Sequence, residues 1–414
     1  MVKKKLVSAL MAAAMSATML AGCGSSGAES TTAAPAATEA TEAKSETEAK
    51  ETEATEATDA EKPADTSEGT KKIGIAMPTK SLERWNRDGS YLEEQFKSQG
   101  YEVALTYSDN KIDQQVKDIE GLIADDVDLL VIAAIDGESL SQVLATAKDE
   151  DIPVISYDRL IKNTDAVSYY VSFDNYTVGK LQGEFVKEQL KLDTEAGPFN
   201  IEFTAGDPAD NNAGFLFNGA FDVLKPYIDE GKLVVPSGQT SFDQVATKSW
   251  ATDAAMNRFQ NILASNYSGD TKLDVALCSN DSTALGVTQA IEADYAGDNT
   301  VIITGQDGDE ANLKNIVDGK QTMTVYKAVA NLAVATVDLG ISILNGETPN
   351  ESLIESSGWN FTCTYDTTSY NNGKADIPSY LLDPTVVTKD NIQKELVDTG
   401  YYTLDANGYP QATN

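Results

Sequence analysis

From Lys71 onward, the chain alternates short apolar runs with amphipathic stretches. Between residues 111 and 126, isoleucine and valine recur three or four positions apart, which is the spacing of a helix with one buried face. The next run, VDLLVIAAI at 127–135, is continuously apolar, as expected of a parallel strand covered on both faces. Strand and helix therefore alternate, which predicts a parallel sheet with right-handed crossovers.

The same pattern predicts two successive series of elements. In the first series, strands are expected at 71–77, 101–108, 127–135 and 152–158, and helices at 91–100, 111–126 and 139–151. In the second, strands are expected at 198–206, 232–239, 273–279 and 301–307, and helices at 176–190, 212–228, 251–265 and 282–294. The predicted fold class is α/β, with two Rossmann-like lobes. A ligand cleft is expected between them, because open α/β sheets bind ligands beyond the carboxyl ends of their strands.

The first 70 residues have a different character. Residues 1–22 begin with MVKKK, continue with a short apolar run and lead into LAGC, which predicts a lipoprotein signal peptide cleaved before Cys23. An ordinary signal peptide with a chance cysteine is the alternative. Acyl chains on Cys23 would hold the protein on the extracellular side of the cell membrane. Residues 23–70, dominated by Ala, Thr and Glu, predict a disordered acidic stalk behind that anchor.

Composition removes several function classes. A net charge of −34 argues against nucleic acid and anionic membrane surfaces as partners. The chain has no histidine, which excludes histidine catalysis and histidine metal sites, and no glycine-rich nucleotide motif or GxSxG occurs. We therefore expect no metal and no cofactor, and no catalytic residue of the histidine type. Cys278 and Cys363 are expected to be free thiols, with a disulfide as the alternative that an extracellular location permits.

Polar side chains cluster where the predicted strands end. SLERW follows the first strand, YDRLI the fourth, and SND and GQD two strands of the second series. Sugar hydroxyls need donors and acceptors together, and an aromatic ring such as Trp85 covers the apolar face of a sugar. The alternative is structural: Trp85 would cap the core while Arg84 pairs with Glu83 or Asp88. Some of the polar residues, among them Asp307, are also suited to cap helices.

Several ordered strings carry a resemblance to a known family. GIAMPTK, YDRLI, YYVSFDN, GDPADNNA, TVYK and PSYLLDP resemble type I (group B) periplasmic binding proteins for monosaccharides, the branch with the D-xylose and agrobacterial multiple-sugar receptors. The resemblance extends from Lys72 to Tyr402. It implies a monomeric receptor that performs no chemistry and delivers a monosaccharide to the permease and ATPase of an ABC importer.

The resemblance also implies a set of ligand-binding residues. These are Glu83, Arg84, Trp85, Asp158, Arg159, Asn212, Trp250, Asn280, Asp307 and Lys327. Glu83 matches the xylose receptor alone, and Asn211 is the alternative to Asn212. Phe215 and Phe217 both remain open as the aromatic residue that sets specificity. The implied ligand is a neutral aldopyranose, with D-xylose first and glucose, galactose or arabinose next.

In this family three segments of a hinge cross between the lobes. We expect these crossings near Asp174, near Lys327 and within 350–359. The expected N-terminal lobe is then 71–174 plus 328–352, and the expected C-terminal lobe is 175–327 plus 353–405. Binding would close the lobes by hinge motion around the sugar.

Three rival functions are weighed against this one. A glycosidase would need two carboxylates such as Glu83 and Asp307 across a scissile bond, but the intervening cations would keep both ionised. A sugar-responsive repressor would need a basic DNA-binding segment before Lys71, where the chain has an acidic stretch. A sensing subunit for chemotaxis or signalling without transport uses the same closed state, so the sequence leaves that alternative open.

Overall fold

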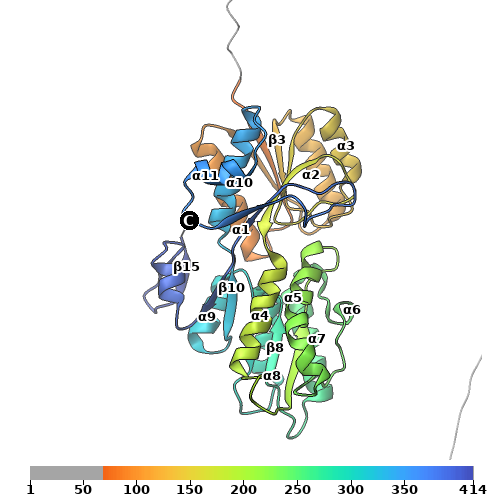
Figure 1. Cartoon of the computed structure of the whole chain (residues 1–414), viewed down its shortest axis with the longest axis vertical. Coiled ribbons are helices and arrows are strands. Elements are labelled where there is room, and N and C mark those ends of the chain that lie inside the picture. The colour runs from red at the N-terminus through yellow and green to blue at the C-terminus, as the bar shows by residue number, and fades with distance from the viewer. Residues whose placement is uncertain (1–68, 414) are drawn as a thin grey trace, which may run out of the picture. The chain divides into compact units, whose positions relative to one another are not determined.

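The computed structural model describes residues 69–413, and Figure 1 shows the arrangement of their helices and strands. The largest sheet has seven strands in the order β11-β12-β5-β4-β3-β1-β2. They are β1 (Lys72–Met77), β2 (Glu102–Tyr107), β3 (Leu129–Ile132), β4 (Val154–Tyr157), β5 (Val167–Phe173), β11 (Cys363–Asp366) and β12 (Ser379–Leu382). Neighbours pair in parallel except β11, which is antiparallel to β12 at the edge. We call this sheet and its helices the N-lobe.

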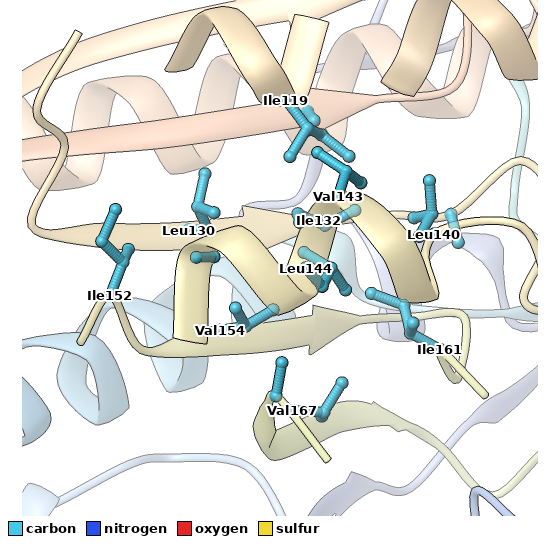
Figure 2. Close-up of a cluster of buried hydrophobic side chains, with 14 of the residues drawn as sticks. Ile119, Leu130, Ile132, Leu140, Val143, Leu144, Ile152, Val154, Ile161 and Val167 are labelled. Atoms are coloured by element: carbon cyan, nitrogen blue, oxygen red, sulfur yellow. The ribbon is translucent and has the colours of Figure 1, made fainter. Parts of the chain in front are cut away.

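Helices cover both faces of the N-lobe sheet. They are α1 (Glu83–Ser98), α2 (Ile112–Ala124), α3 (Ser141–Asp149), α10 (Val329–Leu344) and α11 (Glu351–Ser357). Leu130 and Ile132 of β3 pack with side chains of α2 and α3 (Figure 2), whereas Leu129 and Val131 of the same strand pack with α1 and α10. Alternate side chains of a strand point to opposite faces, so the continuously apolar run is explained by burial on both sides.

The C-lobe is built on a second, smaller parallel sheet in the order β7-β6-β8-β9. Its strands are β6 (Phe199–Thr204), β7 (Leu233–Val234), β8 (Val275–Cys278) and β9 (Ile302–Ile303). Its helices are α4 (Asn175–Gln189), α5 (Asn211–Asp229), α6 (Phe242–Val245), α7 (Thr252–Asn266), α8 (Asp281–Asp294) and α9 (Glu310–Asp318), with a 3₁₀ turn, η1 (Lys248–Trp250). The expected α/β fold class with two parallel sheets is confirmed.

The C-terminal part of the chain completes the C-lobe. Strand β10 (Met323–Tyr326) pairs antiparallel with β13 (Thr385–Thr388). A π-helical turn, η2 (Gln393–Val397), leads to a hairpin of β14 (Tyr402–Leu404) and β15 (Pro410–Ala412). The alternation of residues before Lys327 predicted β10, but the pattern of apolar residues did not predict β13, η2, β14 or β15.

The third crossing between the lobes lies elsewhere than expected. Residues 353–382 were assigned to the C-terminal lobe, but they form β11 and β12 of the N-lobe sheet. Strand β12 pairs in parallel with β5, and this ladder keeps the segment on the N-lobe until Asp383. The chain thus changes lobes after β5, after β10 and after β12.

Helix α1 begins earlier than the pattern predicted. We expected a loop before residue 91, but the helix starts at Glu83, so Arg84 and Trp85 lie in its first turn. Trp85, Leu92 and Phe96 are all buried and share one face of the helix. This apolar face packs the first turn into the N-lobe, which fixes both residues at the end of β1.

Two remaining expectations concern membranes and thiols. Within residues 69–413, the helices are too short or too polar to cross a membrane. Cys278 and Cys363 are free thiols, and burial raises the pKa of both. Cys23 and the predicted stalk lie outside the described residues.

Helices α4 and α5 touch backbone to backbone, and glycine makes this contact possible. A Cβ built on Gly179 of α4 would lie 1.9 Å from the carbonyl oxygen of Leu216, and one on Gly219 of α5 would lie 2.1 Å from that of Tyr176. Neither space accepts a methyl group without moving a helix. The first turn of α5, which carries Asn212, is therefore positioned against α4 at a fixed spacing.

We expect Gly179→Ala to lower the free energy of unfolding by about 1–3 kcal/mol, because the added methyl group overpacks the helix contact. Gly214→Ala is the matched control on α5, where a new Cβ meets nothing within 4 Å. It should be neutral or stabilising, by up to about 1 kcal/mol. Urea unfolding followed by circular dichroism measures both. Equal effects of the two substitutions would contradict the close contact.

Candidate functional site

A cavity lies where strand ends of the two lobes meet. It is lined by Leu82, Arg84, Trp85, Asp158, Arg159, Asp210, Asn212, Leu216, Trp250, Asn280, Ser282, Gln306, Asp307 and Lys327. The volume between these walls that is free of protein atoms is about 380 Å³, the opening included. This volume lies at the lower end of the range of small-molecule sites.

Arg84 is the centre of the charge network at this cavity. Its Nε donates to Asp88 at 3.1 Å, its Nη2 to Asp158 at 2.6 Å and its Nη1 to Asp307 at 3.2 Å. The hydroxyl of Tyr157 donates to the other oxygen of Asp88. The first two carboxylates belong to the N-lobe and the third to the C-lobe, so one guanidinium joins both lobes.

Asp158 is held as an anion at the end of β4. Burial alone would raise the pKa of this carboxyl, but the charges of Arg84 and Lys327 hold it well below its usual range. The Nζ of Lys327 lies 3.3 Å from Asp158 Oδ1 and donates to Asn175 at 3.1 Å. Lys327 directly follows β10, so the second crossing between the lobes carries this cation to the cavity.

The backbone of Asp158 is itself in an uncommon conformation, with φ at 58°. Its carbonyl oxygen accepts hydrogen bonds from Tyr170 Oη at 2.8 Å, Ser172 Oγ at 2.9 Å and Asn212 Nδ2 at 2.7 Å. Asn212 belongs to α5 of the C-lobe, whereas the other two donors lie on β5. These three bonds hold a strained residue at the site.

Two tryptophans form parts of the wall. The Cζ atoms of Arg84 and Arg159 each lie 4.8 Å from the centre of the Trp85 ring, so that ring supports two cations. Trp250 packs its ring against Gly206, where a Cβ would meet the ring at 2.0 Å. Ser249 and Trp250 both have positive φ, and this tight turn brings the indole to the cavity.

The C-lobe supplies further polar groups. Asp210 Oδ2 lies 3.0 Å from Arg159 Nε, which makes a second ion pair between the lobes. Asn280 is the N-cap of α8, where its Oδ1 accepts from the amide of Thr283 at 3.0 Å. Because the cap uses Oδ1, the Nδ2 amide is the group that Asn280 offers to a ligand. Capping and lining the cavity are thus compatible roles.

The cavity contains every residue expected to bind the ligand except Glu83. The carboxylate of Glu83 instead accepts from the amide of Glu310 at 3.0 Å and pairs with Arg87 at 3.4 Å. The carboxylate of Glu83 thus faces the start of α9 instead of the cavity, so we do not carry Glu83 further as a ligand-binding residue. Asn212 lines the cavity, and its alternative Asn211 is not among the residues that do.

Phe215 and Phe217 were the two candidates for the aromatic residue that sets specificity, and neither lines the cavity. Leu216, which lies between them in the sequence, does line it. Phe215 lies outside, with its ring 6.1 Å from that of Tyr370 in the N-lobe. Phe217 packs against Phe203 in the core of the C-lobe.

Sequence reasoning missed several cavity residues. They are Leu82, Asp210, Leu216 and Ser282, and Gln306 was noted at a strand end without a role. Asp210 had a usable signal, since it lies two residues before the predicted helix and Asp is a typical N-cap residue, and its side chain does cap α5, which begins at Asn211. The sequence contained no signal that Leu82 and Leu216 line a cavity, because single leucines are usually core residues.

The comparisons with known proteins identify the family. The profile described as a periplasmic binding protein domain matches residues 73–348. The multiple sugar-binding periplasmic protein SbpA of Azospirillum brasilense is 42% identical over 334 residues, which cover 80% of this chain and 89% of that protein. This chain belongs to the periplasmic binding protein family.

Two further relatives show how far the similarity extends. The D-xylose-binding periplasmic protein of Escherichia coli K12 is 35% identical over 80% of this chain and 91% of that protein. The crystal structure of an ABC transporter solute-binding protein from Clostridium phytofermentans, with bound β-D-glucose, superposes with a TM-score of 0.75. It is 52% identical and covers 80% of this chain and 98% of that one. The two periplasmic relatives are named as sugar-binding proteins and the solved structure as an ABC transporter solute-binding protein, so the expectation of a non-enzymatic receptor is confirmed.

Asp158→Asn should destabilise this periplasmic binding protein by about 3–5 kcal/mol at pH 7, because Arg84 and Lys327 lose a buried counter-charge. The folded pKa of Asp158 lies below the unfolded one, so its stabilisation is present above about pH 4 and is lost as the pH falls through the folded pKa. The melting temperature of the variant should therefore fall less steeply in acid than that of the wild type. Calorimetric scans across pH measure this, with the exposed Asp390→Asn as control. Parallel curves would contradict it.

Proposed function

We propose that this protein captures a neutral monosaccharide between its lobes and delivers it to an ABC importer. The observation that carries the proposal is the composition of the cavity wall, in which three cations, three carboxylates, several amides and two tryptophans surround a small space. Each sugar hydroxyl can donate one hydrogen bond and accept others, and this wall offers both kinds of partner. The tryptophans offer apolar surface for the C–H faces of a sugar ring.

The charge balance favours a neutral ligand. Arg84, Arg159 and Lys327 each already lie within ion-pair distance of a carboxylate. A phosphate or sugar acid would need unpaired cations and would be repelled by Asp158 and Asp307 in a poorly hydrated space. A neutral aldose can exchange hydrogen bonds with these groups without adding charge.

The identity of the sugar is proposed from the relatives together with the site. A relative that is named for D-xylose is 35% identical, and one solved with β-D-glucose is 52% identical. We therefore propose D-xylose, which was our first expectation, and D-glucose as equally favoured ligands, followed by galactose and arabinose. The ligand-binding residues that we propose are Arg84, Trp85, Asp158, Arg159, Asn212, Trp250, Asn280, Asp307 and Lys327.

Calorimetric titration of the purified full-length protein with single sugars tests the proposal. We expect at least one neutral aldose among xylose, glucose, galactose and arabinose to bind with a dissociation constant below about 1 mM. Loss of one matched hydroxyl should weaken binding by about 1–3 kcal/mol. Glucuronate and glucose 6-phosphate serve as controls for charge. Tightest binding of a charged sugar, or no binding of any neutral aldose, would overturn the proposal.

We also propose that the protein is a monomer that Cys23 anchors by acyl chains to the extracellular side of the cell membrane. Support comes from the LAGC sequence after a basic and apolar start. The tether would keep the receptor near the importer's permease and ATPase.

Cys23→Ala should release the protein from the membrane fraction and leave its sugar affinity unchanged, because the anchor lies outside the binding lobes. Fractionation of cells followed by immunoblotting measures the release. Cys363→Ala is the matched control and should leave the distribution unchanged. A Cys23→Ala protein that still sediments with membranes would show that the anchor lies elsewhere.

A further inference from the structure

Arg87 carries a second buried guanidinium on α1, outside the cavity wall. Its side chain is 10% exposed. Nη1 donates to the carbonyl oxygen of Gly308 at 3.1 Å and to Tyr402 Oη at 2.7 Å. Nη2 donates to the carbonyl oxygen of Asp307 at 3.3 Å and to Asp309 Oδ1 at 3.2 Å. All four acceptors belong to the C-lobe, whereas Arg87 belongs to the N-lobe, so these bonds join the lobes.

The turn that Arg87 contacts is strained and held from two sides. Asp307 has φ at 103°, a region that side-chain-bearing residues rarely adopt, and Gly308 follows with φ at 77°. Asp281 of the C-lobe accepts hydrogen bonds from the amides of Gly308 and Asp309, both at 2.9 Å. The turn thus gives its N–H groups to its own lobe and its carbonyl groups to Arg87. The position of Asp307 at the cavity depends on the hydrogen bonds to Asp281 and on those from Arg87.

Arg84 and Arg87 reach the same turn in different ways. Arg84 meets the side chain of Asp307 at 3.2 Å, and both of these groups line the cavity. A bound sugar would compete for both, since they are also partners for its hydroxyls. Arg87 instead contacts backbone carbonyl groups and does not line the cavity. Its bonds between the lobes can persist while Arg84 turns to the sugar.

We propose that Arg87 is a positioning residue for sugar capture, a latch that holds the turn 307–309 of the C-lobe against α1 of the N-lobe. The inference rests on the proposed function. An interaction that favours the binding-competent arrangement of the lobes adds to the apparent affinity without touching the ligand. Because the latch acts after the sugar has entered, its loss mainly speeds release.

Arg87→Met removes the donors and keeps much of the apolar stem. We expect about 10- to 100-fold weaker binding of D-glucose and D-xylose to the purified full-length protein. Most of this change should be a faster dissociation rate, measured by stopped-flow tryptophan fluorescence, with little change in the association rate. Arg87→Lys should recover part of the affinity, because an ammonium group can still donate to one carbonyl.

Arg258→Met is the matched control. The guanidinium of Arg258 is also largely buried, and it donates to Phe203, Thr204 and Gln239 within the C-lobe. Its loss should lower the melting temperature and leave the dissociation rate unchanged. Tyr402→Phe is a milder test of the latch, because its hydroxyl accepts from Arg87 and donates to the carbonyl oxygen of Gly308.

The outcomes separate the latch from the proposed function. If the wild type binds a neutral aldose and Arg87→Met releases it no faster, the latch is overturned and the proposed function stands. If the wild type binds none of the four neutral aldoses, the proposed function fails, and the latch is then tested by small-angle scattering of the sugar-free proteins. A larger radius of gyration in Arg87→Met than in Arg258→Met supports it, and equal radii overturn it.

Discussion

Burial of charge between the two lobes is the constraint on which the site depends. The guanidinium of Arg84 is almost completely enclosed, with Asp88 and Asp158 from its own lobe and Asp307 from the other. A buried ion costs several kcal/mol unless opposite charges and hydrogen bonds compensate it. The lobes can enclose Arg84 only where these carboxylates converge. The strand ends and the first turn of α1 must therefore lie where their carboxylates can compensate the charge of Arg84.

The same constraint limits what the cavity can accept. Each cation of the wall already has a carboxylate within 3.3 Å, and the carboxylate of Asp158 is shared by two of them. A ligand that brings a net charge would leave an uncompensated ion in a poorly hydrated space. A neutral polyol instead replaces some of these contacts with hydrogen bonds of similar geometry. The selectivity that we propose for neutral ligands would therefore be a property of the whole network rather than of one residue.

Much of this arrangement could be predicted from residue patterns, because long buried strands and helices leave a strong periodic signal. Parallel strands also place their carboxyl ends at one edge of each sheet, so a cleft between two such lobes was expected to contain Asp158 from one lobe and Asn280 and Asp307 from the other. Two features could not be predicted. The N-cap residue of α1 is Leu82, whose side chain cannot cap a helix, so the local sequence does not indicate where α1 begins. Strand β12 is recognised by pairing with β5, which is far away in sequence.

Three residues that line the cavity have an uncommon backbone conformation. Asp158, Trp250 and Asp307 all have positive φ, although none is glycine. Such conformations persist where surrounding bonds over-determine them, and the carbonyl groups of Asp158 and Asp307 both accept donors from the opposite lobe. Contact between the lobes thus supports the strained geometry, and separation of the lobes would remove that support. The site is consequently assembled in its binding geometry by the same contacts that bring the lobes together.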